Sequence, residues 1–270
     1  MSESACTGAA VGASLAGMKP IVVHPRMDFM LYAMDPVVNQ AAKWSHMLGG
    51  QAHPSVTIRS IINRGGEQGA QHSQALHAWF AHVPGLRVVM PSTVADARDL
   101  LIASVLCNDP VMYIDDRWLY DQEDELPPVV ELDLASQKPV VSLTGSDITI
   151  VASGHSSLLA REAAQQLEIE KISVEVVDVR VLNPFYSEEI IESVKKTKNL
   201  LVVDSGWISG GFSAEVIAKV VEQLSVDCLS NPPVRIALPD APAPTSRFLE
   251  KAYYTSTDDV VEAVKKILGN

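Results

Sequence analysis

Short apolar runs alternate with amphipathic stretches along the whole chain. The runs that predict buried strands are residues 19–23, 56–61, 86–91, 110–114, 147–152, 174–179, 200–204 and 234–238. Apolar residues at helical spacing predict a helix within residues 28–47, and further helices are predicted within residues 157–167, 188–196, 214–224 and 258–268. A hydroxyl cap at residues 92–93 opens another helix, and a run of small Gly and Ala residues predicts a close-packed helix at residues 8–17. Strands that alternate with helices are typical of mainly parallel sheets, so we expect an α/β fold.

A polar, proline-bearing stretch at residues 121–139 interrupts this alternation and predicts a linker. The same strand–helix pattern starts again after it. We therefore expect two domains, residues 1–135 and 136–270, each a three-layer α/β/α unit.

Composition excludes some classes of protein. The chain has 270 residues, 47% of them hydrophobic, which is enough for a substantial core, and its formal net charge is −12. An acidic chain is a poor ligand for nucleic acid or an anionic membrane, and no apolar run has the length of a spanning helix. Cys6, Cys107 and Cys228 are isolated thiols without paired metal spacing, so we expect a cytoplasmic protein with no metal ligands of its own.

Two segments carry candidate chemistry. Glu3 precedes a run of small residues, and His72 lies in the Gly-flanked loop Gln71-His72-Ser73-Gln74. A carboxylate before a close-packed Gly/Ala helix and a histidine in such a loop predict parts of a cofactor pocket. Two simpler interpretations compete. A glutamate before a helix is favoured by the helix dipole alone, and most histidines are surface or core residues.

Nine segments in a fixed order identify a family resemblance. They are residues 2–3 with the helix 8–17, 28–29, 39–43, 69–74, 79–85, 88–93, 182–184, 204–206 and 238–246. Together they resemble the beta subunit of the thiamin-diphosphate-dependent 2-oxo acid dehydrogenases, the decarboxylating component of the pyruvate, acetoin and branched-chain complexes. The resemblance implies a pyrimidine-binding domain followed by a transketolase C-terminal-like domain.

The resemblance also assigns roles to single residues. Glu3 is expected to bind the aminopyrimidine ring of the cofactor and to favour the imino tautomer that thiamin chemistry needs. His72 is expected to face the reacting carbon, in proton handling or in receiving the lipoyl arm. Phe29 is expected to pack on the aminopyrimidine ring, and Tyr32 lies one turn further along as a second cofactor-binding candidate.

Three further residues stay open at this point. Arg26 and Arg59 are candidates for contact with a carboxylate. His24 lies on the strand that leads toward the expected cofactor wall, without an assigned role.

The implied reaction is oxidative decarboxylation of a 2-oxo acid with acyl transfer to lipoamide. The implied partners are an alpha subunit, which would hold Mg²⁺ and the diphosphate of thiamin diphosphate, and a lipoyl-bearing acyltransferase. A beta homodimer within a heterotetramer is the expected assembly. One alternative is another thiamin-dependent half-subunit, of the transketolase or deoxyxylulose phosphate synthase type. The other is a non-catalytic assembly subunit, because relatives carry a strand–helix unit ahead of the glutamate and Glu3 stands near the start of this sequence. We expect that unit to be supplied by another chain or lost.

Overall fold

The computed structural model describes residues 2–269, apart from the side chain of Val226, and it consists of two compact units. The first unit comprises Met1–Gln137 and Val181–Pro184, and the second comprises Lys138–Arg180 and Phe185–Asn270. The chain therefore returns briefly to the first unit after entering the second, which local sequence pattern does not indicate. Among the described residues no helix is long and apolar enough to cross a membrane.

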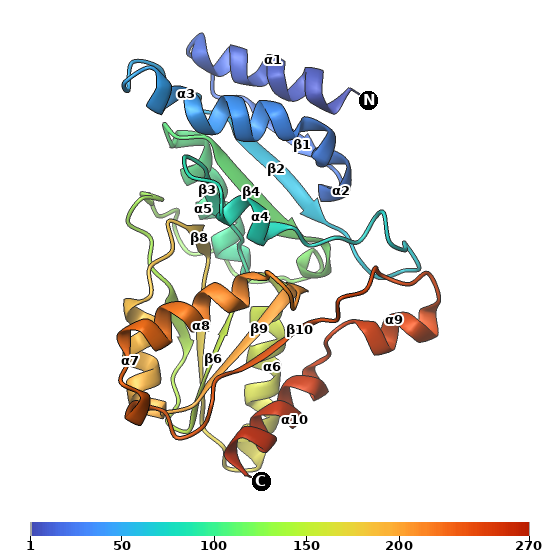
Figure 1. Cartoon of the computed structure of the whole chain (residues 1–270), viewed down its shortest axis with the longest axis vertical. Coiled ribbons are helices and arrows are strands. Elements are labelled where there is room, and N and C mark those ends of the chain that lie inside the picture. Colours follow the sequence, from blue (N-terminus) through green and yellow to red (C-terminus); the bar gives the residue numbers. More distant parts are fainter. Residues whose placement is uncertain (1, 270) are drawn as a thin grey trace. The chain divides into compact units, whose positions relative to one another are not determined.

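The first unit is built on a five-stranded sheet with the order β1-β2-β4-β3-β8 (Figure 1). Its strands are β1 Ile21–His24, β2 Thr57–Ile62, β3 Arg87–Val89, β4 Val111–Asp116 and β8 Val181–Asn183. Only β8 is antiparallel, against β3, and the other pairs are parallel. Every residue of β4 is buried, as expected for a central strand covered on both faces.

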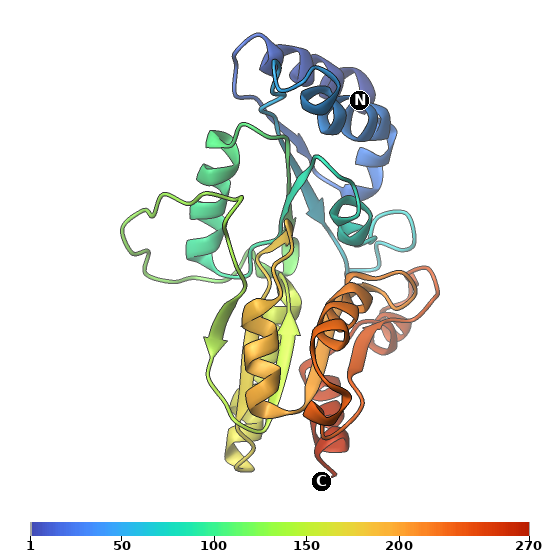
Figure 2. The same cartoon turned by 60° about the vertical axis from the view of Figure 1, so that its left-hand side comes forward.

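Helices cover both faces of this sheet. They are α1 Glu3–Leu15, α2 Met27–Met30, η1 Leu31–Ala33, η2 Asp35–Ala41, α3 Ala42–Met47, α4 His77–Ala81, α5 Val94–Leu106 and η3 Arg117–Leu119. Tyr113 packs toward α5 in a core cluster, whereas His24 contacts α1. In the sheet register His24 aligns with Ile114, and neighbouring strand residues point to opposite faces. Helices α5 and α1 therefore lie on opposite sides (Figure 2).

The single helix predicted over residues 28–47 is interrupted. The structure has an α-helical turn, a 3₁₀ turn, a π-helical segment and a final α-helix there. Pro36 lies at the start of the π-helical segment, and proline lacks the N–H that a regular helix would use. The hydrophobic period is helical throughout, so the pattern indicated the helix without indicating its irregularity.

The second unit has a sheet with the order β10-β9-β6-β7-β5, and only β5 is antiparallel. The strands are β5 Val140–Leu143, β6 Ile148–Ala152, β7 Val174–Asp178, β9 Leu200–Trp207 and β10 Val234–Leu238. The helices are α6 His155–Ile169, α7 Glu188–Thr197, α8 Phe212–Gln223, η4 Val226–Cys228, α9 Arg247–Tyr253 and α10 Thr257–Leu268. The two mainly parallel sheets confirm the predicted fold class.

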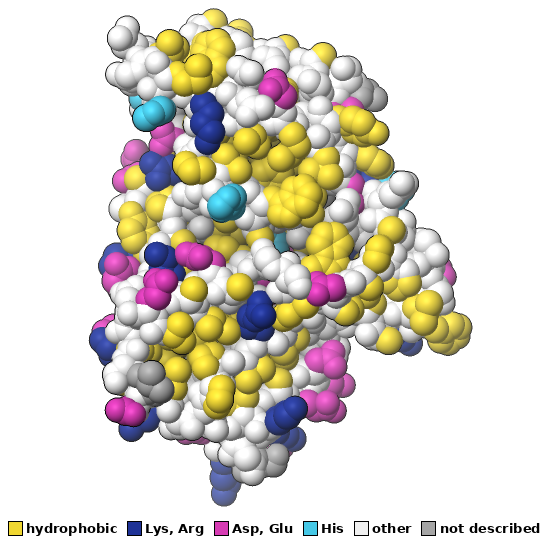
Figure 3. All heavy atoms as spheres, in the orientation of Figure 1, with side chains coloured by type: hydrophobic (Ala, Val, Ile, Leu, Met, Phe, Trp, Pro, Cys, Tyr) yellow, Lys and Arg dark blue, Asp and Glu magenta, His cyan; other side chains and the backbone are white. Residues whose placement is uncertain are grey.

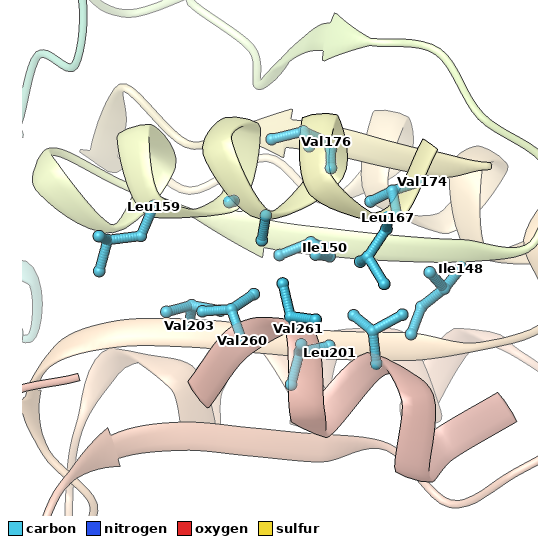
Figure 4. Close-up of a cluster of buried hydrophobic side chains, with 14 of the residues drawn as sticks. Ile148, Ile150, Leu159, Leu167, Val174, Val176, Leu201, Val203, Val260 and Val261 are labelled. Atoms are coloured by element: carbon cyan, nitrogen blue, oxygen red, sulfur yellow. The ribbon is translucent and has the colours of Figure 1, made fainter. Parts of the chain in front are cut away.

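The core of the second unit lies between its sheet and the helices α6 and α10 (Figure 4). Ile150 and Leu201 on the strands face Leu167 of α6 and Val261 of α10 in this cluster. Helices α7 and α8 contact the strands as well, and Thr149 bonds Ser193 of α7 from the other face. The unit thus has the three layers that the sequence predicted.

Candidate functional site

Polar side chains of the first unit gather where its parallel strands end. Strand β1 ends at His24, β2 at Ile62 and β4 at Asp116, and these three strands are neighbours in the sheet. Parallel strands run in one direction, so the residues that follow them meet at one edge. Ligands of α/β proteins bind at that edge. All residues predicted for the site lie in this unit.

Glu3 begins α1 and is half-buried, and one turn later Thr7 is fully buried. The Thr7 hydroxyl lies 3.1 Å from Nε2 of His24, the last residue of β1. Burial lowers the pKa of His24, and the Glu3 carboxylate raises it by a smaller amount. The imidazole is therefore neutral at pH 7 and lies in the electric field of the glutamate. His24 thus contacts the helix that begins at Glu3.

This arrangement predicts a pH dependence of stability. The unfolded chain takes up the His24 proton near the ordinary pKa of 6.5, whereas the folded chain takes it up only at lower pH. The free energy of unfolding should therefore fall as the pH drops from about 7 to 5. His24→Gln should reduce this fall, as measured by urea unfolding at both pH values. Thr7→Val, which removes the hydroxyl but no titrating group, should keep it. An unchanged fall in His24→Gln would contradict the assignment.

Phe29 and His72 come together from segments far apart in the sequence. Phe29 lies on α2, and His72 lies in the loop between β2 and α4. Their ring centroids are 5.3 Å apart and the rings are perpendicular, so the pair is an edge-to-face contact. Phe29 is 39% exposed and His72 is half-buried, which leaves surface of both rings open to a ligand.

Asp28 holds the histidine loop in place. Its Oδ1 accepts hydrogen bonds from the backbone N of Gln74 at 3.2 Å and from Nε2 of Gln74 at 2.9 Å. The other carboxylate oxygen of Asp28 is buried and has no partner among the described residues, and the same is true of the Ser73 hydroxyl. The residues beside Phe29 and His72 therefore retain unused hydrogen-bonding capacity at the site.

Tyr32 lies in η1 and is 75% exposed. It makes no hydrogen bond or ring contact with another described residue. The structure thus brings Phe29 next to His72 but leaves Tyr32 on the surface of this unit. Figure 3 shows that hydrophobic side chains gather on one face of the first unit, with acidic and basic groups scattered around them.

The structure adds a buried ion pair at the same edge, between Arg64 and Asp116. The two side chains are 4% and 0% exposed. The guanidinium also lies 4.9 Å from the ring centroid of Trp118, whose backbone N donates to Asp116 Oδ1 at 3.1 Å. Gly65 has φ +76°, and a Cβ there would come within 2.8 Å of the Trp118 ring.

The sequence analysis did not single out the ion pair of Arg64 and Asp116 or the neighbouring Trp118. The available signal was positional: Asn63 and Arg64 directly follow β2, and Arg117 and Trp118 directly follow β4. A search for polar residues immediately after each predicted strand would have found them.

Arg59, a candidate for contact with a ligand carboxylate, is already paired with a carboxylate of the protein. Its guanidinium binds Asp115 and lies 3.4 Å from the hydroxyl of Tyr120. Burial raises the pKa of Asp115 despite the arginine beside it. These groups line a cavity of about 430 Å³ that also includes Val94 and Ala97 of α5. Arg59 therefore lies on the α5 face of the sheet, away from His24 and Thr7.

The two halves of the chain match two family models. The model "Transketolase, pyrimidine binding domain" matches residues 1–122, and "Transketolase, C-terminal domain" matches residues 138–260. In the part of the chain that the structure describes, no group of three His, Cys, Asp or Glu side chains is placed to hold a metal ion.

Curated relatives match almost the whole chain. The pyruvate dehydrogenase E1 component subunit beta of Rhizobium meliloti is 37% identical over 99% of this chain and 58% of its own length. The protein of the same name from Rickettsia felis is 37% identical over 99% of this chain and 81% of its own length. The acetoin:2,6-dichlorophenolindophenol oxidoreductase subunit beta of Cupriavidus necator is 37% identical over 99% of this chain and 79% of its own length. The chain thus spans between just over half and four fifths of these relatives.

Solved structures share the fold at lower identity. A split-gene transketolase, described as an inactive beta4 tetramer, has a TM-score of 0.77 at 24% identity and covers 100% of this chain and 82% of its own. A transketolase mutant from Pichia stipitis has a TM-score of 0.69 at 18% identity, with 99% of this chain and 37% of that chain covered.

Proposed function

Because the chain belongs to the family of pyruvate dehydrogenase E1 component beta subunits, we propose that it is the beta subunit of a thiamin-diphosphate-dependent 2-oxo acid dehydrogenase. In this role it takes part in oxidative decarboxylation of a 2-oxo acid and in acyl transfer to lipoamide, together with an alpha subunit. The contact between Phe29 and His72 carries the proposal. It puts an open aromatic face beside a proton-exchanging imidazole, in the unit that matches a pyrimidine-binding domain.

The residues present fit the aminopyrimidine of thiamin diphosphate. The half-buried carboxylate of Glu3 suits a ring nitrogen, the exposed part of the Phe29 ring suits a flat heterocycle, and the unpartnered oxygens of Asp28 and Ser73 supply further polar contacts. When bound, the cofactor supplies the carbanion that attacks the 2-oxo carbon. Glu3 lies close enough to His24 for its carboxylate to raise the pKa of that imidazole, although burial lowers this pKa by more.

In this proposal His72 holds or moves a proton at its imidazole. Phe29 presses edge-on against the ring, and Asp28 anchors the following residues of the loop through Gln74. These contacts fix the imidazole before substrate arrives, and fixed geometry is a large part of the benefit of general acid–base catalysis. Tyr32 remains a candidate for cofactor contact at the exposed end of the same segment.

The proposal includes the partners that the family resemblance implies. An alpha subunit would hold the diphosphate and Mg²⁺, and a lipoyl-bearing acyltransferase would receive the acyl group. Two beta subunits would pair within a heterotetramer. Cys6, Cys107 and Cys228 are free thiols, which supports a reducing cytoplasm as the compartment.

Co-expression with a candidate alpha subunit tests this function. We expect the two chains to copurify, to bind thiamin diphosphate in the presence of Mg²⁺ in a calorimetric titration, and to decarboxylate a 2-oxo acid. Cofactor binding and assembly without turnover of any 2-oxo acid would favour the non-catalytic alternative. Transfer of a ketol group between sugars would favour the transketolase alternative.

A further inference from the structure

Two arginines at the carboxyl edge of the first sheet have no carboxylate partner among the described residues. Arg26 follows β1 directly before α2, and Arg117 begins η3 after β4. The other four arginines of this unit each pair with an aspartate, as Arg59–Asp115, Arg64–Asp116, Arg87–Asp109 and Arg98–Asp99. Within residues 2–269, Arg26 and Arg117 make no such pair. The chain carries a net charge of −12, so carboxylates are not scarce.

Both guanidinium groups converge on one neutral side chain. The Asn63 amide is oriented by its neighbours, because only its oxygen can accept from Arg26 Nη1, at 2.5 Å, and from Arg117 Nη1, at 3.3 Å. A second bond runs from Arg26 Nη1 to the backbone oxygen of His72 at 3.4 Å. Each guanidinium has five N–H donors, and these contacts use few of them.

Two cations held on one amide oxygen repel each other unless an anion lies between them. The planar donors of arginine match a carboxylate in geometry and charge, and such charge-assisted bonds are the strong ones. Arg26 is half-buried and Arg117 is exposed, so the pair is open to a ligand from solvent. The arrangement is that of a preformed carboxylate site beside the loop that carries His72.

We propose that Arg26 and Arg117 bind a second carboxylate of the substrate, one that is retained through the reaction, and so select 2-oxo dicarboxylic acids. This inference rests on the proposed decarboxylation. The carboxylate that leaves as CO₂ loses its charge in the transition state. Two guanidinium groups holding it would stabilise the ground state and slow the step. A distal carboxylate keeps its charge throughout. Arg26 also contacts the backbone oxygen of His72, and this contact leaves the imidazole ring free of the arginine. The carboxylate site therefore lies next to the predicted reacting position and does not occupy it.

Steady-state kinetics of the assembled enzyme test this inference. We compare a five-carbon 2-oxo dicarboxylic acid with the five-carbon straight-chain 2-oxo monocarboxylic acid, in wild type, Arg26→Gln and Arg117→Gln. Wild type should prefer the dicarboxylic acid in kcat/KM. The ratio of the two kcat/KM values should fall at least about tenfold in Arg26→Gln, mainly through KM, and fall in Arg117→Gln as well. Arg87→Gln, which breaks an ordinary pair with Asp109, should leave the ratio unchanged.

Three results would overturn the inference. The first is a higher kcat/KM of wild type for the monocarboxylic acid. The second is a ratio of the two kcat/KM values that neither substitution changes. The third is an equal fall of kcat/KM for both substrates in Arg26→Gln. The last result would assign the arginine to the reacting carboxylate. If the complex turns over neither substrate, the proposed function fails, and calorimetric titration of the full chain with glutarate then decides. A lower affinity for glutarate in Arg26→Gln and Arg117→Gln, but not in Arg87→Gln, would support the carboxylate site. An affinity that is the same in all the variants would refute it.

Discussion

We expect Glu3→Gln to lower 2-oxo acid decarboxylation by the assembled enzyme about 10²- to 10³-fold, the usual cost of removing one preorganised electrostatic contact in an active site. The amide keeps the size of the side chain but loses the negative charge that favours the imino tautomer of the cofactor. The loss should appear mainly in kcat, because the charge matters most when the reactive form develops. Single-turnover decarboxylation with saturating thiamin diphosphate measures it.

Controls separate this chemistry from folding. Glu3→Gln should still copurify with the alpha subunit, and its circular dichroism should match that of wild type, since α1 is held by its buried face of Thr7, Val11 and Ser14. Ser4→Ala, an exposed neighbour in the same turn, should retain full turnover. Wild-type turnover in Glu3→Gln would remove Glu3 from the catalytic residues and leave the family assignment intact.

The largest effect on stability is expected at the buried ion pair of the first unit. Asp116→Ala should lower the free energy of unfolding by about 3–5 kcal/mol, because it leaves the Arg64 charge buried without its carboxylate. It also removes the cap on the Trp118 backbone N. Urea unfolding followed by circular dichroism measures the change. The transition of the first unit should shift to a lower urea concentration, and that of the second unit should be unchanged.

A second Arg–Asp pair in the same unit supplies the matched control. Arg87 and Asp109 are 25% and 36% exposed, so Asp109→Ala should cost only about 0–1 kcal/mol, as is usual for solvated pairs. Equal effects of the two substitutions would mean that burial does not determine the contribution of these pairs. Replacing both Arg64 and Asp116 by apolar residues should recover part of the loss, because both buried charges are then removed.

Local sequence pattern predicted most of the helices and strands. The predicted strand at residues 147–152 is β6, and the predicted helix at residues 258–268 is α10, which begins with the capping box of Ser256 and Asp259. The antiparallel strands β5 and β8 were not predicted. Strand β5 lies at a sheet edge with all four residues exposed, and β8 has three residues, so neither carries a long buried pattern.

Gly85 is a residue whose role is explained only by the tertiary structure. Gly85 ends one of the segments on which the family resemblance rests. In the structure its φ is +95°, and a Cβ there would lie 1.9 Å from the carbonyl oxygen of Ala42. The position needs glycine because two backbones meet, and Ala42 is distant in sequence.

The sequence by itself determined the order of helices and strands, the division into two α/β units and the family, because hydrophobic period and motif order are properties of neighbouring residues. It also indicated Glu3, Phe29 and His72 as candidates. The tertiary structure alone decided which of them meet. The contacts of His24 with Thr7, of Asp28 with Gln74, and of Arg26 and Arg117 with Asn63 join residues 17 to 54 positions apart. They arise because the sheet order brings the ends of β1, β2 and β4 to one edge, and strand order is not encoded in the spacing within any one segment.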